Sequence, residues 1–173
     1  MYVSVGLSPG SIPTMPCSML ARYAGQLEFG SVDLTVDEAR RRASVARVAR
    51  LATVDADDAP HIVPVVFAVE RDAIFIAVDQ KPKKTRDLKR LRNIRENPQV
   101  SLLIDQYDDD DWSRLWWVRA DGNARIITSE QVASANPRAL LIPKYPQYVS
   151  DPPIGPFICI AVQHWRGWQY SET

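Results

Sequence analysis

The sequence has only two cysteines, Cys17 and Cys159, and no apolar run as long as the roughly 20 residues that a membrane-spanning helix needs. Its N-terminus also lacks the basic and then apolar stretches of a secretory leader. Cys17 lies in a segment without helix or strand periodicity, so a disulfide staple is not predicted and a reducing compartment fits. We therefore expect a cytoplasmic protein with no membrane partner.

An excess of charge of one sign is also lacking, because 21 Lys and Arg balance 21 Asp and Glu. This balance argues against a surface built for nucleic acid, and no nucleic-acid partner is expected. The charges are nevertheless unevenly spread. Residues 81–95 contain eight basic side chains and one acid, and residues 105–111 contain five aspartates.

Several motifs that would identify an enzyme are missing. The sequence contains no Gly-x-Gly-x-x-Gly, Walker-type loop or Gly-x-Ser-x-Gly. The only histidines, His61 and His164, lie in different expected strands, and the aspartate run lacks the glycine and glutamate of an EF-hand loop. Cys159 lies in an apolar strand, where a thiolate would be poorly solvated. No metal site is predicted, and these patterns identify no catalytic residue.

The length of 173 residues fits one domain. Residues 1–33 hold four of the seven glycines and three prolines, a composition typical of a flexible N-terminal extension. The folded domain is expected over residues 34–173. It begins with Thr35 and Glu38 at capping-box spacing, ahead of a helix that reaches about Ser44.

The rest of the domain reads mainly as short strands. Strands are expected near residues 48–54, 61–69, 73–78, 100–105, 115–120, 123–128 and 157–164. Asp121-Gly122 is a favoured hairpin pair, Thr85 can cap a short helix that Asn97-Pro98 ends, and Pro137 should start or interrupt a helix. A closed antiparallel barrel of six or seven strands removes exposed sheet edges, so we predict this fold class, mainly β with short helices.

The basic segment between the third strand and the short helix is the best candidate binding site. Lys83, Lys84 and Thr85 bring ammonium groups and a hydroxyl close to the backbone N–H groups of a helix N-terminus. An ionised phosphate needs these donors, and the helix dipole favours it there. For Lys89, Arg90 and Arg92 a solvated helix face is the favoured interpretation.

Two adjacent tryptophans, Trp116 and Trp117, lie in one expected strand and must face opposite sides of the sheet. One can fill the barrel or a subunit interface while the other flanks a ligand. The alternative is that both serve packing alone.

Several runs together resemble the pyridoxamine 5′-phosphate oxidase-like split β-barrel flavoproteins, also called the FMN-binding split barrel. They are 49–54, 61–67, 81–86, 93–98 and 100–105. Three further stretches, 111–122, 144–148 and 165–168, resemble the actinobacterial branch that uses the deazaflavin coenzyme F420. Two features depart from the family pattern: residues 1–33 have no counterpart, and Ala135-Asn136-Pro137 interrupts a stretch that is normally helical.

The resemblance implies a homodimer with two cofactor sites at the subunit interface. Lys84 and Thr85 match the phosphate-contacting positions, Lys81 and Lys83 are neighbours, and Lys81 and Arg86 would meet the acidic tail of F420. Pro64, Val65 and Ala77 would line the ring, and Trp117 is a further candidate for cofactor binding.

The activity that the resemblance implies is a coenzyme F420-dependent oxidoreductase, which transfers a hydride between the deazaflavin and a small-molecule organic substrate. An FMN-dependent oxidase or reductase on the same barrel is one alternative. A non-catalytic flavin- or tetrapyrrole-binding protein is the other.

Overall fold

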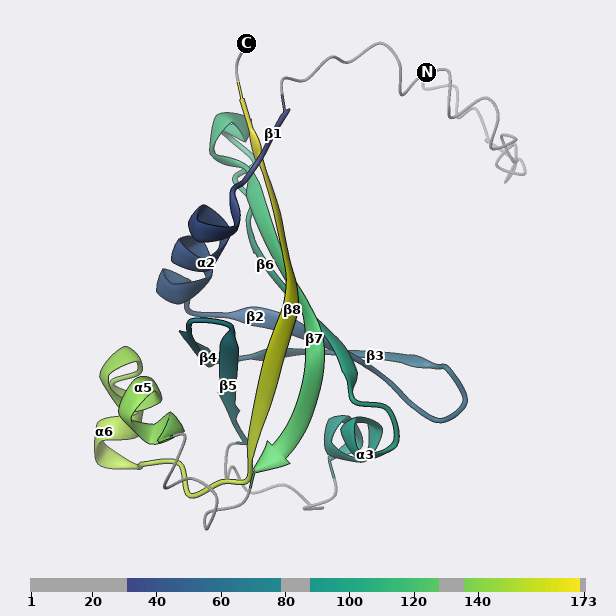
Figure 1. Ribbon diagram of the computed structural model, residues 1–173. Coiled ribbons are helices and arrows are strands. Elements are labelled where there is room, and N and C mark those ends of the chain that lie inside the picture. Colours follow the sequence, from purple (N-terminus) through teal and green to yellow (C-terminus); the bar gives the residue numbers. More distant parts are fainter. Residues whose placement is uncertain (1–30, 79–87, 128–135, 172–173) are drawn as a thin grey trace, which may run out of the picture.

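The computed structural model describes residues 31–78, 88–127 and 136–171 (Figure 1). Five helical elements are present there: α2 (Val36–Val45), α3 (Lys89–Glu96), the 3-10 turn η1 (Trp112–Arg114), α5 (Pro137–Lys144) and α6 (Gln147–Ser150). The strands are β1 (Ser31–Asp33), β2 (Ala49–Val54), β3 (Pro60–Val65), β4 (Phe67–Glu70), β5 (Ala73–Ala77), β6 (Gln99–Gln106), β7 (Trp116–Ile127) and β8 (Phe157–Tyr170). Within these ranges no helix is long and apolar enough to span a membrane.

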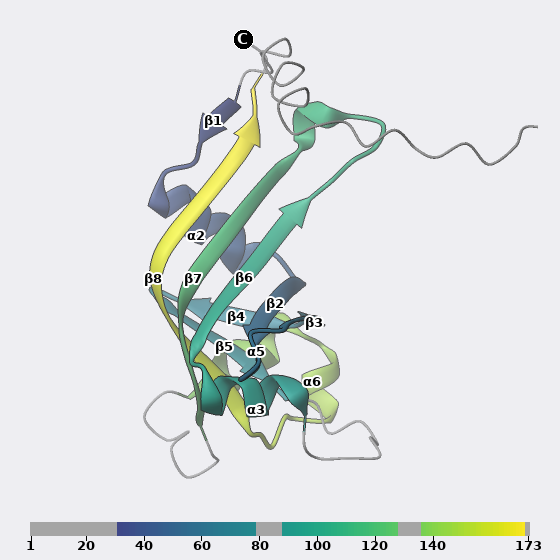
Figure 2. The same cartoon turned by 90° about the vertical axis from the view of Figure 1, so that its right-hand side faces the viewer.

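All strand pairs are antiparallel and follow the order β3-β2-β6-β7-β8-β5-β4, with β1 added beside the end of β8. The two strands at the ends of this path, β3 and β4, are consecutive in sequence and separated by Val66 alone. The chain itself therefore links both ends of the sheet. Figure 2 shows β6, β7 and β8 side by side as long curved strands. This arrangement confirms the mainly β split-barrel class.

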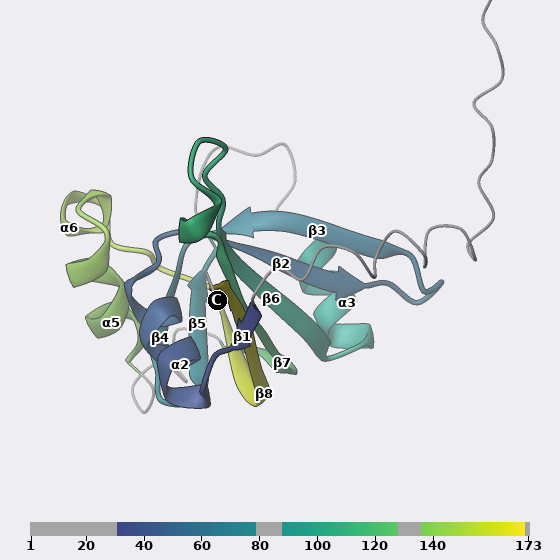
Figure 3. The ribbon, with the colours of Figure 1, turned by 90° about the horizontal axis from the view of Figure 1, so that it is seen from above.

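The core has two parts that lie beneath different helices. The first fills the barrel between the sheet and helices α2 and α3, and includes Leu51, Leu102 and Val118. The second joins β4, β5 and β8 to helices α5 and α6, and includes Phe157 and Tyr145. Seen from above, α5 and α6 lie on the opposite side of the molecule from α3 and the β2–β3 pair (Figure 3).

Two of the helices, α2 and α5, begin where the sequence signals place them. The Thr35 hydroxyl accepts a hydrogen bond from the Glu38 backbone N–H at 3.2 Å, as the capping-box spacing predicts. Asn136 caps α5, and Pro137 occupies its first turn, which confirms that this proline starts the helix. Helix α3 differs from the expectation, because it begins at Lys89 with Leu88 at the N-cap position instead of Thr85.

The expected hairpin at Asp121-Gly122 is wrong. Strand β7 runs unbroken through both residues, and its register against β8 shifts there in a bulge. A glycine is needed at position 122 because β8 lies very close to β7 there. A Cβ on Gly122 would lie 2.2 Å from the backbone oxygen of Ala161. The 61–69 stretch likewise divides at Val66 into β3 and β4, and β8 extends to Tyr170 instead of ending near His164.

Candidate functional site: the β5–α3 region, the outer sheet face and an arginine-lined pocket

The proposed phosphate-binding residues Lys81, Lys83, Lys84, Thr85 and Arg86 lie outside the described residues, and their role stays a prediction. The described flanks place this segment between the end of β5 and the start of α3. The first turn of α3 contains no acidic residue, and Leu88 provides no side-chain cap. Among the described residues no side chain caps this helix start, whose N–H groups and partial positive charge suit an anion.

The proposed ring-lining residues lie at the bend between β3 and β4. Val65 ends β3, and Phe67 pairs with Ile76, so the bend lies beside Ala77 at the end of β5. The side chains of Val65 and Ala77 are buried in the two core clusters, whereas Pro64 is exposed and pairs with Arg50. Contact of Pro64, Val65 and Ala77 with a cofactor ring stays a prediction.

Tyr145 holds this bend in place, a role that the sequence reasoning missed. Its buried hydroxyl accepts a hydrogen bond from the Phe67 N–H at 2.9 Å and lies 2.7 Å from the Phe67 carbonyl and 2.9 Å from that of Arg47. Burial raises the pKa of Tyr145, which keeps the donating proton in place. The only signal in the sequence was the resemblance of stretch 144–148 to the family.

The neighbouring Lys144 is half-buried. Its ammonium lies 4.3 Å from the centroid of the Phe67 ring, and its Nζ is buried with no hydrogen-bond partner among the described residues. Burial, with a smaller contribution from Arg47, lowers the pKa of Lys144 from 10.5 to about 8. The charged form of Lys144 is therefore disfavoured in the folded state.

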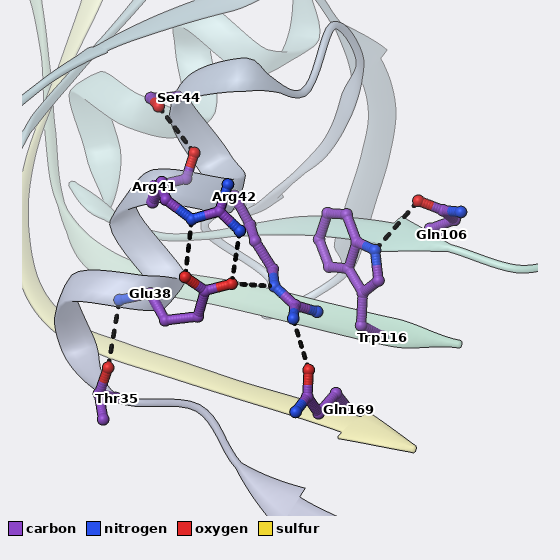
Figure 4. Close-up of polar contacts among 8 residues, drawn as sticks. All are labelled: Thr35, Glu38, Arg41, Arg42, Ser44, Gln106, Trp116 and Gln169. Atoms are coloured by element: carbon purple, nitrogen blue, oxygen red, sulfur yellow. Dashed lines mark hydrogen bonds and ion pairs between the residues drawn. The ribbon is translucent and has the colours of Figure 1, made fainter. Parts of the chain in front are cut away.

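The two adjacent tryptophans face opposite sides of the sheet, as alternation predicts. Trp116 points toward α2, where the guanidinium of Arg42 lies 5.2 Å from its ring centroid, and its Nε1–H donates to Gln106 at 3.0 Å (Figure 4). Trp117, a proposed cofactor-binding residue, lies on the outer face and pairs with Asp105 and Trp168. Its contact with a cofactor stays a prediction.

The outer sheet face consists of the outward side chains of β3, β2, β6, β7 and β8. Exposed apolar side chains there include Ile62, 64% exposed, and Leu103, 39% exposed. Several polar groups on this face pair with one another. Arg50 forms an ion pair with Asp105, and Asp121 accepts hydrogen bonds from Ser101 and Arg119. The outer sheet face therefore presents apolar side chains beside ion pairs.

The aspartate run helps to fold its own loop. Asp108 accepts from the Asp110 N–H and pairs with Arg114 at 3.1 Å, while Asp111 caps η1 through Ser113. Among the residues that the structure describes, no group of three or more His, Cys, Asp or Glu side chains converges on one point. Cys159 is a free, buried thiol in the second core cluster.

An arginine-lined pocket of about 420 Å³ lies at the opposite end of β7 from α3, between α2, η1 and the ends of β6 and β8. We call it the arginine pocket. Its lining residues are Arg41, Arg42, Val45, Gln106, Ser113, Arg114, Leu115, Trp116 and Gln169.

Glu38 organises one wall of the arginine pocket (Figure 4). Its carboxylate accepts two hydrogen bonds from Arg41 and one from Arg42, each at 2.7 Å. These guanidinium groups lower the pKa of Glu38 to about 2, so the carboxylate stays ionised at neutral pH. Arg42 also donates to Gln169 on β8 at 2.5 Å, which fixes its guanidinium beside Trp116.

Comparison with known proteins identifies the family. The model of the pyridoxamine 5′-phosphate oxidase family matches residues 35–169, and the chain belongs to this family. Curated proteins gave no match. The family assignment agrees with the mainly β, antiparallel fold.

Solved structures share the fold at low sequence identity. A FAD-binding protein from Mesorhizobium loti is 19% identical with a TM-score of 0.61, and the match covers 82% of this chain and 98% of that one. A FAD-binding protein from Mycobacterium smegmatis is 14% identical with a TM-score of 0.53, over 82% and 100% of the two chains. A heme storage protein from Vibrio cholerae is 17% identical with a TM-score of 0.53, over 80% and 89%.

Proposed function

We propose that this protein is a coenzyme F420-dependent oxidoreductase that transfers a hydride between the deazaflavin and a small organic substrate. The observation that carries the proposal is the basic segment of this split barrel, which joins β5 to the start of α3. The bound cofactor would supply the redox chemistry, so the protein needs no catalytic dyad of its own.

The chain's residues would bind and orient the cofactor. Lys84 and Thr85 would donate to its phosphate together with the N–H groups at the start of α3, and Lys81 and Lys83 would add positive charge. Lys81 and Arg86 would meet the carboxylates of the glutamyl tail. Pro64 and the backbone beside Val65 and Ala77 would position the ring, and Trp117 would shield one side of the site from water.

FMN is the alternative cofactor, since it offers the same phosphate but no acidic tail. The FAD-binding proteins with this fold favour a flavin as a second candidate. The heme storage protein with this fold makes non-catalytic tetrapyrrole binding a third. F420 is favoured over FMN on charge, because residues 81–95 carry more positive charge than one phosphate needs.

The test is a titration of the purified protein with F420, FMN and heme, followed by visible spectra and tryptophan fluorescence. We expect F420 to bind more tightly than FMN, and longer glutamyl tails to bind more tightly still. The double variant Lys81→Ala with Arg86→Ala should abolish the gain from the tail. Preference for FMN with oxygen-consuming turnover, or for heme without turnover, would overturn the F420 assignment.

Lys84→Ala tests the phosphate site itself. Loss of a charge-assisted hydrogen bond should weaken cofactor binding by about 1.5–3 kcal/mol. Arg95→Gln is the matched control, because Arg95 is exposed in the last turn of α3, away from the helix start. Equal affinities for wild type and Lys84→Ala would remove the proposed site.

We further propose that the protein is a homodimer whose two cofactor sites lie between subunits. The outer sheet face supports this proposal, because its apolar side chains lie among ion pairs that need no solvent counter-charge. Trp117 lies on the same face and would contribute to the shared site from there.

A further inference from the structure

Three arginines and no acidic residue line the arginine pocket. Arg41 and Arg42 share the single carboxylate of Glu38, while Arg114 pairs with Asp108. Asp111 lies next to the lining, where its carboxylate accepts from the Ser113 hydroxyl. These six groups balance in charge, so the pocket suits an anion through the guanidinium donors of its lining and not through a net charge.

The lining guanidinium groups also retain donors. Each guanidinium has five N–H groups. Within the described parts of the chain, Arg41 uses two of its nitrogens, Nε and Nη2, and Arg42 uses the same two, while Arg114 uses Nη1 alone. Terminal N–H groups on all three side chains remain for a ligand, and a planar fork of this kind suits carboxylate and phosphate oxygens.

The remaining walls of the pocket are apolar or hold the arginines in position. Val45, Leu115 and the indole of Trp116 provide apolar surface, and Gln169 and Trp116 both contact Arg42. Figure 4 shows Arg42 between Glu38, Gln169 and Trp116, so three elements, α2, β7 and β8, fix this guanidinium. A volume of about 420 Å³ falls within the range of small-molecule sites.

We propose that the arginine pocket binds a small organic anion, with its carboxylate or phosphate on the guanidinium groups of Arg41, Arg42 and Arg114 and its apolar body against Val45, Leu115 and Trp116. The site is separate from the proposed cofactor region. It lies where β7 begins, whereas α3 and the end of β5 lie where β7 ends. The inference does not depend on the identity of the cofactor.

The test is isothermal titration calorimetry of the full chain with phenyl phosphate and with benzoate. The two probes show whether the pocket prefers a phosphate or a carboxylate. Binding of either probe agrees with the proposal. Inorganic phosphate, which lacks the apolar body, should bind more weakly, and phenol, which lacks the charge, should not bind. Affinity should fall as salt is added, because salt screens exposed charges.

Two variants locate the bound probe. Arg41 and Arg114 have side chains 64% and 60% exposed, so Arg41→Gln and Arg114→Gln should leave the fold intact. Each should weaken binding about two- to fivefold, and the double variant about tenfold, as expected for exposed ion pairs. Arg95→Gln, exposed on α3 outside both the pocket and the outer sheet face, is the matched control and should bind as wild type does.

Three results would overturn the proposal. The first is no binding of either probe to the wild-type chain at millimolar concentration. The second is an equal loss of affinity in Arg95→Gln, which would indicate diffuse attraction to basic side chains. The third is binding that Lys84→Ala abolishes and the double variant Arg41→Gln with Arg114→Gln leaves unchanged, because the probe would then occupy the proposed cofactor region.

Discussion

A single side chain, that of Tyr145, holds the β3–β4 bend that links the two ends of the sheet. Tyr145 follows the last residue of α5. Its hydroxyl contacts the backbone of Phe67 and of Arg47, which lie 78 and 98 residues earlier in the sequence. Its hydroxyl forms hydrogen bonds with backbone N–H and C=O groups that would otherwise be buried without a partner. A buried backbone group without a partner costs more than the hydrogen bond itself contributes.

Tyr145→Phe tests this role. The substitution keeps the ring but leaves the Phe67 N–H without its acceptor, and should lower the free energy of unfolding by about 1–3 kcal/mol. Urea denaturation measures the change. Tyr107→Phe is the control, since Tyr107 is 60% exposed and should lose little. A variant as stable as wild type would show that the bend does not need the hydroxyl.

Lys144 should destabilise the fold at neutral pH, because its charge is buried without a hydrogen-bond partner. Its pKa is about 8 in the folded state and 10.5 in the unfolded state. Between those values the unfolded chain binds more protons, so stability rises with pH. Lys144→Met should therefore raise the free energy of unfolding by about 1–2 kcal/mol at pH 7, after allowance for partial exposure, and this gain should shrink from pH 8 to 9.5.

Urea denaturation of wild type and Lys144→Met at pH 7, 8, 9 and 9.5 measures this difference. Lys89→Met is the matched control, because the Lys89 ammonium pairs with Asp55 and is 42% exposed. That variant should show no gain. A gap between Lys144→Met and wild type that stays constant up to pH 9.5 would contradict titration of Lys144 in this range.

At the scale of elements, the sequence predicted what depends on local chemistry and missed what depends on distant strands. Thr35, Pro137 and the alternation at Trp116-Trp117 act within a few residues, and each prediction is confirmed. Asp121-Gly122 has the local chemistry of a hairpin, yet its backbone continues because β8 lies directly against Gly122. No local pattern reports that contact.

The candidate site residues divide in the same way, into those that local sequence indicates and those that only the folded structure brings together. The basic segment was visible in sequence as donors beside an expected helix start, although Leu88 and not Thr85 is the N-cap of α3. The arginine pocket was not, because its residues come from α2, β6, η1, β7 and β8 and meet only in the folded barrel. Tyr145 was seen only as part of a resemblance, since its partners Phe67 and Arg47 are 78 and 98 residues away.

Gly122→Ala tests the close approach of β7 and β8. The new Cβ would lie 2.2 Å from Ala161 O and 2.9 Å from Val162 Cα, which are backbone atoms that cannot rotate away. Forced separation of the strands should cost about 3 kcal/mol, the upper part of the range for overpacking. Thermal unfolding of Gly122→Ala and of the exposed neighbour Asn123→Ala provides the comparison. Equal melting temperatures would mean that the bulge absorbs the methyl group.

For the whole molecule, the link between the two sheet ends through Val66 leaves the inner face filled. Among the described residues no helix covers the outer face around Leu103, because α2 and α3 pack on the first core cluster and α5 on the second. The proposed second copy of the chain would cover this face. Obligate homodimer interfaces are large and apolar, which fits an extended sheet surface.

Ile62 and Leu103 allow a direct test of the dimer, because both lie on the outer sheet face in register with neighbours on β2. Wild type should sediment as a dimer down to nanomolar concentration in analytical ultracentrifugation. The double variant Ile62→Glu with Leu103→Glu should sediment as a monomer, because the dimer would bury two unpaired carboxylates per chain. Val149→Glu is the control: Val149 is 68% exposed on α6, outside the outer sheet face, and its variant should remain dimeric. A wild-type monomer that still binds cofactor, or a double variant that remains dimeric, would show that the outer sheet face is not the subunit interface.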